Sequence, residues 1–347
     1  MSYTNINKSS LHMNTKLYTG NGTAGHAITG VGFEPSLTWI KKRSGSSDQI
    51  LTDAVRGAGY HIKSNDTAAQ GNDTNDISSF NSDGFTLGVN SRTNGSGATL
   101  TSWNWKAGTT SGISAGSQTI TPTAYSINVD AGFGIYKYTG NGTAGATISH
   151  GLGVKPDQVW VKKLSQSDGW RCYNVGYNSG HQYFELDTTA SYSESIAVFN
   201  GTIPTSTTVT LGYQGHVNAS GQQYIMYVFA PKVGFSKMGR YYGNGSNDGT
   251  FVYTGFKPSF VLVKRGDNAG NWYINDTKRD PYNQMSHTLF PNLSDSETST
   301  GWFVDYVSNG FKIRDTGTSV NGSGGNYIYY AVGQTLVGSN NVPCTAR

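Results

Sequence analysis

The sequence is poor in charged residues, and glutamate is especially rare. Charged residues make up 13% of the 347 residues, whereas about 25% is typical of soluble domains. Glutamate occurs at only four positions, Glu34, Glu185, Glu194 and Glu297. An enzyme that hydrolyses glycosidic bonds needs two carboxyl groups facing one sugar ring. The scarcity of glutamate disfavours a surface-glycan hydrolase, and we expect no enzymatic activity.

Cysteine and long apolar runs are also nearly absent. Cys172 and Cys344 are the only cysteines, which is too few for a disulfide framework. No run approaches the ~18 apolar residues of a membrane-spanning helix, so we expect no insertion into a membrane. The first residues lack the basic and apolar regions of a secretory signal. We therefore expect a protein that is made and folded in a cytoplasm.

Positive charge is sparse and spread along the chain. The net charge is +4, and the basic clusters are residues 41–43, 162–163 and 264–265. Each cluster follows a predicted strand, so we expect solvated strand ends. A stripe that binds phosphate or lipopolysaccharide would use the same residues and remains the alternative. Three short clusters do not form a nucleic-acid footprint, and we expect no nucleic-acid partner.

One phrase of the sequence recurs. Residues 18–25 return letter for letter at 138–145, and a worn form returns as Tyr242-Gly243-Asn244-Gly245. Two further anchors recur in the same order, a proline six residues before a lysine and an Asn-x-Ser-Gly motif: Pro35/Lys41, Pro156/Lys162 and Pro258/Lys264, then Asn94, Asn218 and Asn321. The period is far above the roughly 20–50 residues of a solenoid repeat. The sequence therefore predicts three tandem copies of one domain.

Short apolar segments separated by turn residues fill each copy. Trp103 and Trp105 alternate with polar neighbours, as in a strand with one buried face. Residues 224–229 are apolar almost throughout, which favours a strand covered on both faces. Glycine, with 46 residues, and Asn-Gly pairs supply turns, and the recurring phrase itself is interpreted as a hairpin turn. No amphipathic helix is evident, so we expect an all-β chain.

The predicted architecture is three tandem antiparallel β-sandwich domains of ordinary size. The boundaries that we predict are an N-terminal segment, three repeats and two linkers: 1–16, repeat 1 at 17–108, a linker at 109–130, repeat 2 at 131–230, a short linker at 231–240, and repeat 3 with a C-terminal tail at 241–347.

Motifs for cofactors and metals are weak. Residues 20–25 match the glycine spacing of a dinucleotide-binding loop, but no helix follows to face a pyrophosphate. The seven histidines show no metal-ligand spacing. Residues 72–76 could supply oxygen ligands to Ca²⁺, although they lack the pattern of an EF-hand loop. We therefore predict no catalytic, cofactor-binding or metal site, with calcium binding at 72–76 left open.

An Asp–Arg pair recurs in two of the three copies. Asp53 and Asp276 occupy one repeat position, and each has an arginine three residues later, Arg56 or Arg279. The middle copy has Asn174 and Tyr177 instead. We expect a brace that shapes a loop, and a catalytic pair in a single domain is the alternative.

Trp170 and Trp272 are the candidate surface-contact residues. Both lie fourteen residues after the repeat proline, where the first copy has Gln49. A core position is expected to stay apolar in every copy, so this position is predicted to be partly exposed. Exposed tryptophans stack on sugars and anchor protein contacts. The alternative is a boundary residue at the start of a strand.

Several segments resemble repeated domains in virion structural proteins of tailed phages, marine phages especially, of the lectin-like or tail-fibre type. They are residues 18–22 and 138–142, residues 151–162, residues 82–88, the opening residues 1–10 and the closing residues 341–347. The likeness covers nearly the whole chain. It implies a setting, the virion, and transfers no set of functional residues.

The resemblance implies a phage virion structural protein, made in the host cytoplasm. A tail-fibre or host-surface-binding component is the first expectation, with weak sites strengthened by many copies. Its expected partners are other virion proteins and a host cell-surface glycan or lipopolysaccharide, and a homo-oligomer, as a trimer, is expected. The alternative is a capsid decoration, cement or head-fibre protein, and a surface-glycan hydrolase is a minor one.

Overall fold

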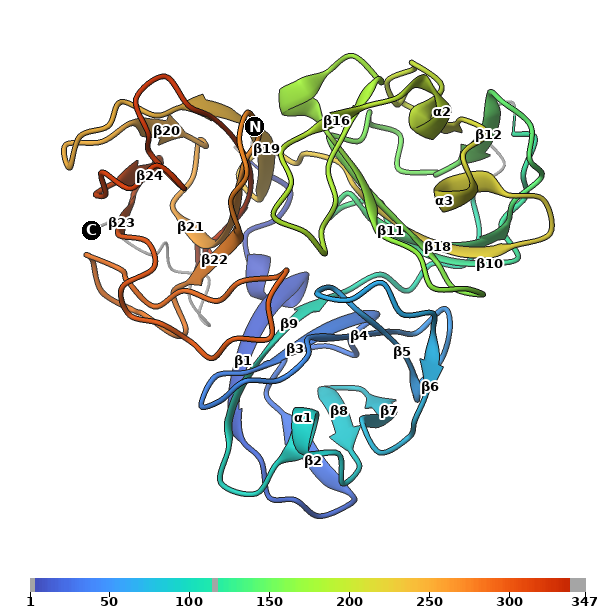
Figure 1. Cartoon of the computed structure of the whole chain (residues 1–347). Helices are drawn as coiled ribbons and strands as arrows, with labels where there is room; N and C mark the ends of the chain where they lie inside the picture. Colours follow the sequence, from blue (N-terminus) through green and yellow to red (C-terminus); the bar gives the residue numbers. More distant parts are fainter. Residues whose placement is uncertain (1–3, 114–117, 338–347) are drawn as a thin grey trace.

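The computed structural model describes residues 4–113 and 118–337. The chain is all-β, its strands pair antiparallel, and its helices are single turns. This confirms the all-β prediction. Cys344 and the closing residues 341–347, which contributed to the resemblance, lie outside the described residues. Figure 1 shows three lobes around a common centre, coloured blue to cyan, green to yellow and orange to red along the chain.

Three large sheets provide the framework of the molecule, one from each third of the chain. The first has the order β1-β9-β3-β4-β5-β6, the second β10-β11-β18-β13-β14 and the third β19-β25-β21-β22. Their bounds are, in turn, β1 (Met13–Thr19), β9 (Thr99–Trp105), β3 (Leu37–Lys42), β4 (Ile50–Asp53), β5 (Tyr60–Lys63) and β6 (Gly71–Asn72); β10 (Ala124–Asn128), β11 (Phe133–Thr139), β18 (Gln223–Phe229), β13 (Gln158–Lys163) and β14 (Arg171–Asn174); β19 (Ser236–Tyr242), β25 (Asn326–Gly333), β21 (Pro258–Arg265) and β22 (Trp272–Asp276).

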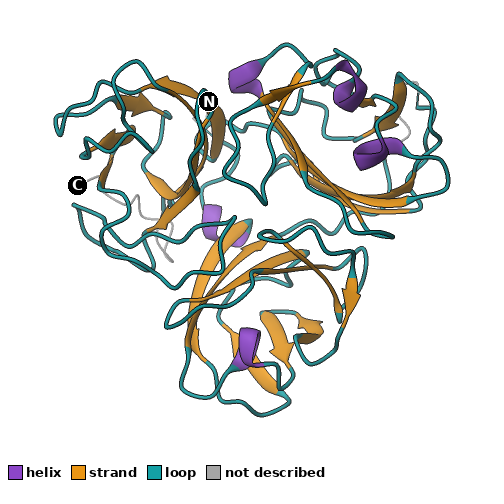
Figure 2. Ribbon diagram, in the orientation of Figure 1, coloured by secondary structure: helices purple, strands orange, loops and turns teal. Residues whose placement is uncertain are grey.

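A smaller sheet accompanies each large one, and the helices are short connections between strands (Figure 2). The small-sheet strands are β2 (His26–Thr29), β8 (Gly84–Leu87) and β7 (Ile77–Asn81); β12 (Ala146–Ser149) and β17 (Thr208–Leu211); β20 (Phe251–Tyr253), β24 (Gly310–Ile313) and β23 (Val304–Val307), with a further pair β15 (Gln182–Tyr183) and β16 (Ser193–Glu194). The helical turns are η1 (Ser9–Leu11), α1 (Ser91–Asn94), η2 (Val175–Tyr177), α2 (Ile196–Phe199) and α3 (Gly215–Asn218).

The large sheets are buried on both faces. On one face each has its own apolar cluster, shared with the small sheet of the same third. On the other face all three contribute to one common cluster. One ring pair across each boundary illustrates it: Trp39 with Trp160 at 5.9 Å, Phe229 with Tyr330 at 5.1 Å, and Trp103 with Phe260 at 6.2 Å between ring centroids. This explains why residues 224–229 are apolar at every position.

The recurring phrase does not form a hairpin turn, contrary to the prediction. It joins β1 to β2, and β1 pairs with β9 while β2 pairs with β8, so the phrase crosses from a large sheet to a small one. The Asn94 side chain holds it by accepting from the Asn21 amide N–H at 3.0 Å and donating to the Thr23 carbonyl at 2.9 Å. Asn218 and Asn321 make the same bonds in the other thirds. The recurring phrase and the Asn-x-Ser-Gly motif therefore contact each other where the chain passes from the large sheet to the small one.

Two positions within the repeats differ from the sequence interpretation. The tyrosine equivalent to Tyr138 is Tyr241, not Tyr242, because Tyr138 pairs with Tyr224 and Tyr241 pairs with Tyr327 at the same register. In addition, β10 lies within the predicted linker 109–130, where it extends the second large sheet. The second predicted linker, 231–240, contains the start of β19. Both predicted linkers are rich in polar residues and glycine, so their composition did not indicate strands.

Candidate functional site

The predicted solvated lysines are buried, which corrects the first expectation for the basic clusters. Lys41, Lys162 and Lys264 have no exposed surface. Each amine donates to a carbonyl six residues ahead in its own repeat, those of Ser47, Asp168 and Gly270. Each also donates to a carbonyl in another repeat: Lys41 to Ser294 at 2.7 Å, Lys162 to Thr67 at 2.8 Å and Lys264 to Thr189 at 3.2 Å. Each lysine therefore joins its own repeat to another repeat by a buried hydrogen bond.

The segments that receive these lysines, 67–70, 189–192 and 294–297, act alike, and we call them the clip segments. The carbonyl that accepts the lysine also accepts a backbone N–H: Asp168 to Thr67 at 2.7 Å, Gly270 to Thr189 at 2.8 Å and Ser47 to Ser294 at 2.7 Å. Three residues on, each clip segment donates back: Gln70 to Leu164 at 3.0 Å, Tyr192 to Gly266 at 2.8 Å and Glu297 to Arg43 at 3.0 Å. Repeat 1 thus clips repeat 2, repeat 2 clips repeat 3, and repeat 3 clips repeat 1. The chain closes into a ring.

Burial lowers the pKa of each of these three lysines to about 8. The physical cause is the loss of water around the ammonium ion. A neutral amine has two N–H groups, which matches the two carbonyls that each lysine reaches. The clip is therefore compatible with an uncharged lysine.

We predict that the ring becomes more stable as the pH rises from about 8 to about 9. The pKa of the folded lysines lies below that of lysines in the unfolded chain, so the unfolded chain binds more protons in this window. The free energy of unfolding, measured by urea titration at each pH, should therefore rise. The buried Cys172 thiol, whose pKa burial raises, opposes this trend, and buried tyrosines such as Tyr227, whose pKa burial also raises, oppose it as the pH approaches about 10.

A lysine substitution provides the control for this pH dependence. Lys162→Met should remove about one third of the slope, while Lys278→Met, at an exposed lysine, should leave it unchanged. A free energy of unfolding that is flat or falls with pH in the wild-type chain would show that the buried lysines do not lose their charge.

Trp170 and Trp272 are buried, with 0% and 1% of their surface exposed, so the prediction of partial exposure is wrong. Their indole N–H groups donate across the repeat boundaries, Trp170 to the Lys63 carbonyl and Trp272 to the Glu185 carbonyl, both at 2.9 Å. Gln49 donates from its side-chain amide to the carbonyls of Phe290 and Leu293. The position requires an N–H donor that reaches a carbonyl four residues before the clip segment of the neighbouring repeat, and glutamine supplies one as tryptophan does.

The Asp–Arg pairs are braces, and they also bridge repeats. Arg56 contacts Asp53 at 2.6 Å, and that carboxylate accepts from the Tyr227 hydroxyl of repeat 2 at 2.7 Å. Arg279 contacts Asp276 at 2.6 Å, and Asp276 accepts from the Trp103 indole of repeat 1 at 3.0 Å. All four charged groups are buried. Tyr227 and Trp103 lie at the same repeat position, so two of the three boundaries share this brace.

The boundary between repeats 2 and 3 lacks this brace. Repeat 2 has Asn174 in place of the aspartate, and its side chain bonds Gln158 at 3.1 Å. Tyr330, the counterpart of Tyr227, instead has its hydroxyl oxygen bonded by the Trp105 indole N–H at 3.1 Å. Trp105 belongs to repeat 1, so this bond reaches across the centre of the ring.

The residues proposed as calcium ligands have protein partners. Asp76 is buried and paired with the Arg92 guanidinium. Asp73 accepts from the Asn75 backbone at 2.9 Å and the Asn90 side chain at 3.1 Å. Within residues 4–113 and 118–337, no group of three or more His, Cys, Asp or Glu side chains is arranged for a metal ion. No helix in the same ranges is long and apolar enough to span a membrane.

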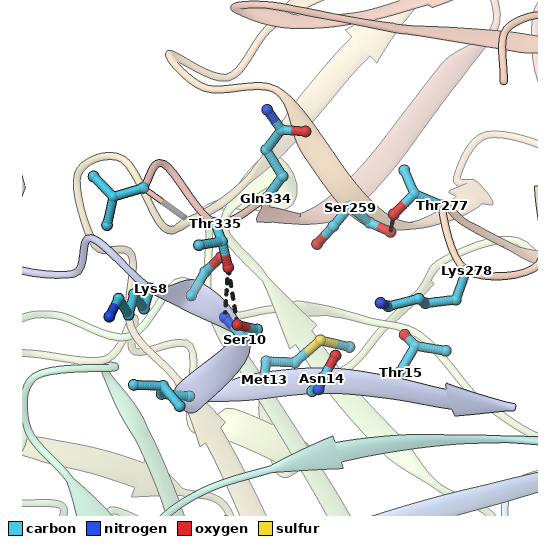
Figure 3. A pocket seen from close by; sticks show the side chains of 13 residues that line it. Lys8, Ser10, Met13, Asn14, Thr15, Ser259, Thr277, Lys278, Gln334 and Thr335 are labelled. Atoms are coloured by element: carbon cyan, nitrogen blue, oxygen red, sulfur yellow. Dashed lines mark hydrogen bonds between the residues drawn. The ribbon is translucent and has the colours of Figure 1, made fainter. Parts of the chain in front are cut away.

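Two of the hollows on the surface of the described residues are candidate binding sites. One, of about 460 Å³, separates the N-terminal segment from repeat 3, with Lys8, Ser10, Thr277, Lys278 and Gln334 around it (Figure 3). The Ser10 hydroxyl and backbone bond Thr335 at its rim, at 2.9 and 3.2 Å.

The other hollow, of about 550 Å³, runs between β19 and β20 and is called here the β19–β20 groove. Phe251 and Tyr253 are exposed beside it, by 43% and 58%, and flank the buried Val252. Lys237 donates to the Tyr253 carbonyl at 2.9 Å and lies over its ring. Sequence reasoning missed these residues, although their alternation along a three-residue strand was visible. Within the described residues, this is the surface with aromatic groups free to contact another molecule beside a groove.

A family model described as a domain of unknown function (DUF7483) matches residues 8–335. No curated protein matches the chain. No solved structure matches it either.

Proposed function

We propose that this chain, which belongs to the DUF7483 family, described as a domain of unknown function, is a structural protein of a tailed-phage virion. In this proposal the three repeats are tandem antiparallel β-sandwich domains, each with a large and a small sheet around its own core. The protein acts by binding and building rather than by catalysis. It is made in the host cytoplasm and assembled into the particle.

The observation that carries the proposal is the closed ring. A string of independent domains would flex at its linkers, whereas here the repeats share a core and three sets of buried hydrogen bonds. The charged groups that could have served chemistry, the lysines and the Asp–Arg pairs, are used to join repeats. A rigid three-lobed unit of this kind suits a particle that must survive outside a cell.

Within the virion, we propose a tail-fibre or host-surface-binding role. Tyr213 and Tyr282, which are 56% and 80% exposed outside the β19–β20 groove, are aromatic residues of the kind that contacts sugars. A host glycan or lipopolysaccharide would be held weakly at each site and firmly by many copies. All three clips are filled within one chain, so a homo-oligomer such as a trimer would form through other surfaces.

One observation favours the alternative of a capsid decoration or head-fibre protein. The N-terminal segment is folded onto the ring: Leu336 donates to the Asn7 carbonyl at 2.8 Å, and His12 contacts Phe235. Residues 4–12 therefore do not extend as an attachment arm. A compact unit that sits on a shell has no need of one.

Localisation in the intact particle tests the proposal. Antibody labelling of virions in electron micrographs, with quantitative mass spectrometry, gives the position and copy number. We expect label on the particle, at the tail if the first role holds and over the head, in far more copies, if the second does. Absence of the protein from purified virions would contradict both.

An adsorption assay separates the two roles. Purified chain should block phage adsorption to host cells if it binds the host surface, and Trp105→Ala, which disrupts the ring centre, should block it less. A virion protein that labels the tail but fails to block adsorption would exclude host binding. Release of reducing sugar from host polysaccharide would instead revive the hydrolase.

A further inference from the structure

The large sheets of repeats 2 and 3 differ in whether an additional strand pairs along one edge. In repeat 2, β11 lies between β10 and β18, so both of its edges are paired. Among residues 4–113 and 118–337, its counterpart in repeat 3, β19, pairs with no strand but β25. An unpaired edge strand presents backbone N–H and C=O groups that can pair with another chain.

In repeat 2, an extended segment of the chain itself pairs along the equivalent edge. Segment 118–128 crosses from the small sheet to the large one: Thr119 and Thr147 exchange hydrogen bonds at β12, and residues 124–128 then pair with β11 as β10. The segment buries Ile120 and Ile127, which are 5% and 2% exposed. It thereby closes the opening between the two sheets of repeat 2 with an extended stretch of polypeptide.

Repeat 1 closes the same opening with its own side chains. Asn14, on the edge strand β1, reaches across to donate to the Val31 carbonyl beyond β2 at 2.8 Å. Lys16 extends towards Gly30, where an added Cβ would lie 3.0 Å from its amine. The small Ala27 faces outward on β2. Polar side chains that bridge the opening leave little need for an added strand.

Repeat 3 is bridged less fully than repeat 1: Lys237, at the position of Asn14, donates to the Tyr253 carbonyl at 2.9 Å, but Gly239 stands at the position of Lys16. Gly239 pairs with Tyr329 at the register where Tyr136 pairs with Met226 in repeat 2, so a large side chain is missing from the edge strand. Phe251 takes the place of Thr147 on the small-sheet strand, and it is exposed. The result is the β19–β20 groove, with a free edge strand on one side and an aromatic strand on the other.

We propose that the β19–β20 groove binds an extended segment of another polypeptide, which pairs with β19 as an added edge strand. The segment enters as 118–128 enters repeat 2, along an edge that the chain itself uses for this purpose. Backbone hydrogen bonds to β19 give affinity, and side-chain contacts on alternate positions give selectivity.

The lining of the groove sets the chemistry of this segment. Phe251 and Tyr253 offer apolar ring surface, and apolar side chains at alternate positions of the segment would cover it. Lys237 lies on the edge strand and Arg240 is exposed beside it, so an acidic residue in the segment finds a cationic partner. The occupant is an extended peptide with alternating apolar residues and at least one carboxylate.

A selection from a library of random short peptides against the purified full chain tests the proposal. We expect selected peptides to alternate apolar and polar residues and to carry an acidic residue. The double variant Phe251→Ser/Tyr253→Ser should weaken their binding by about tenfold or more, since tenfold corresponds to about 1.4 kcal/mol and truncating central aromatic contacts costs about 2 kcal/mol or more. Lys237→Glu, which keeps the rings, should weaken binding through charge. Tyr282→Ser removes an aromatic residue that is 80% exposed outside the groove lining and should change nothing.

Hydrogen–deuterium exchange distinguishes strand addition from other binding. A bound peptide should slow exchange of the backbone amides of β19, because they become paired. Peptides that bind without protecting β19, or a library that yields none sensitive to these variants, would overturn the proposal. So would an oligosaccharide that binds through Phe251 and Tyr253 and leaves β19 unprotected, since the groove would then be a sugar site.

Discussion

Replacing Asp276 with alanine is expected to lower the free energy of unfolding by about 3 kcal/mol, the lower end of the range for breaking a buried ion pair, because Arg279 loses its nearest counter-charge and keeps Glu297 at 2.9 Å. Arg279 has no exposed side-chain surface. The same carboxylate accepts from Trp103 in repeat 1, so the substitution also removes a bond that closes the ring. Chemical denaturation followed by tryptophan fluorescence measures the change.

Two variants control this prediction. Asn174→Ala, at the equivalent position of repeat 2, removes a side chain with no charged partner and should cost much less. The double variant Asp276→Ala/Arg279→Met should recover part of the loss, because it also removes the guanidinium that has lost its nearest counter-charge. If Asp276→Ala costs no more than Asn174→Ala, the Asp–Arg brace does not stabilise the ring.

Replacing Trp105 with alanine is expected to destabilise the chain by about 3–5 kcal/mol through the cavity it leaves in the common core. The indole contacts Phe133 and Phe229 of repeat 2 and Phe260 of repeat 3, with ring centroids 6.0 to 6.4 Å apart. It also bonds Tyr330. One side chain of repeat 1 therefore supports both other repeats.

The measurement is the midpoint of thermal unfolding, with fluorescence and circular dichroism as probes. Trp105→Ala should lower it for all three repeats together. Tyr282→Ala, at a residue that is 80% exposed, should stay within about 0.5 kcal/mol of the wild type. A Trp105→Ala chain in which only repeat 1 loses structure would contradict a common core.

Local periodicity predicted much of the fold. The alternation at Trp103 and Trp105 and the continuous apolar run at 224–229 indicated strands with one or two buried faces, and the structure places both in large sheets. The repeated anchors indicated one unit used three times. Strand β10 and the recurring phrase show the limit of this reasoning. Polar composition obscured β10 although its partner β11 follows it directly, whereas the phrase joins two strands whose partners lie far away in the sequence and leave no local pattern.

The candidate site was mispredicted because its residues meet between repeats. A lysine after a strand usually ends in water, and only the neighbouring clip segment supplies the carbonyls that bury Lys162. The change from Trp170 and Trp272 to Gln49 suggested tolerance of exposure, yet it preserves an N–H donor. Aligned polar positions with a shared donor are the signal that could have revealed the boundary.

Differential scanning calorimetry of the whole chain tests most directly that the three repeats form one closed unit. The common core and the clips predict a single transition in which the calorimetric and van't Hoff enthalpies agree, because no repeat can unfold without exposing the aromatic core of the others. Two or three separable transitions, each with the enthalpy of one repeat, would show that the repeats are stable on their own and would contradict the ring as the structural unit.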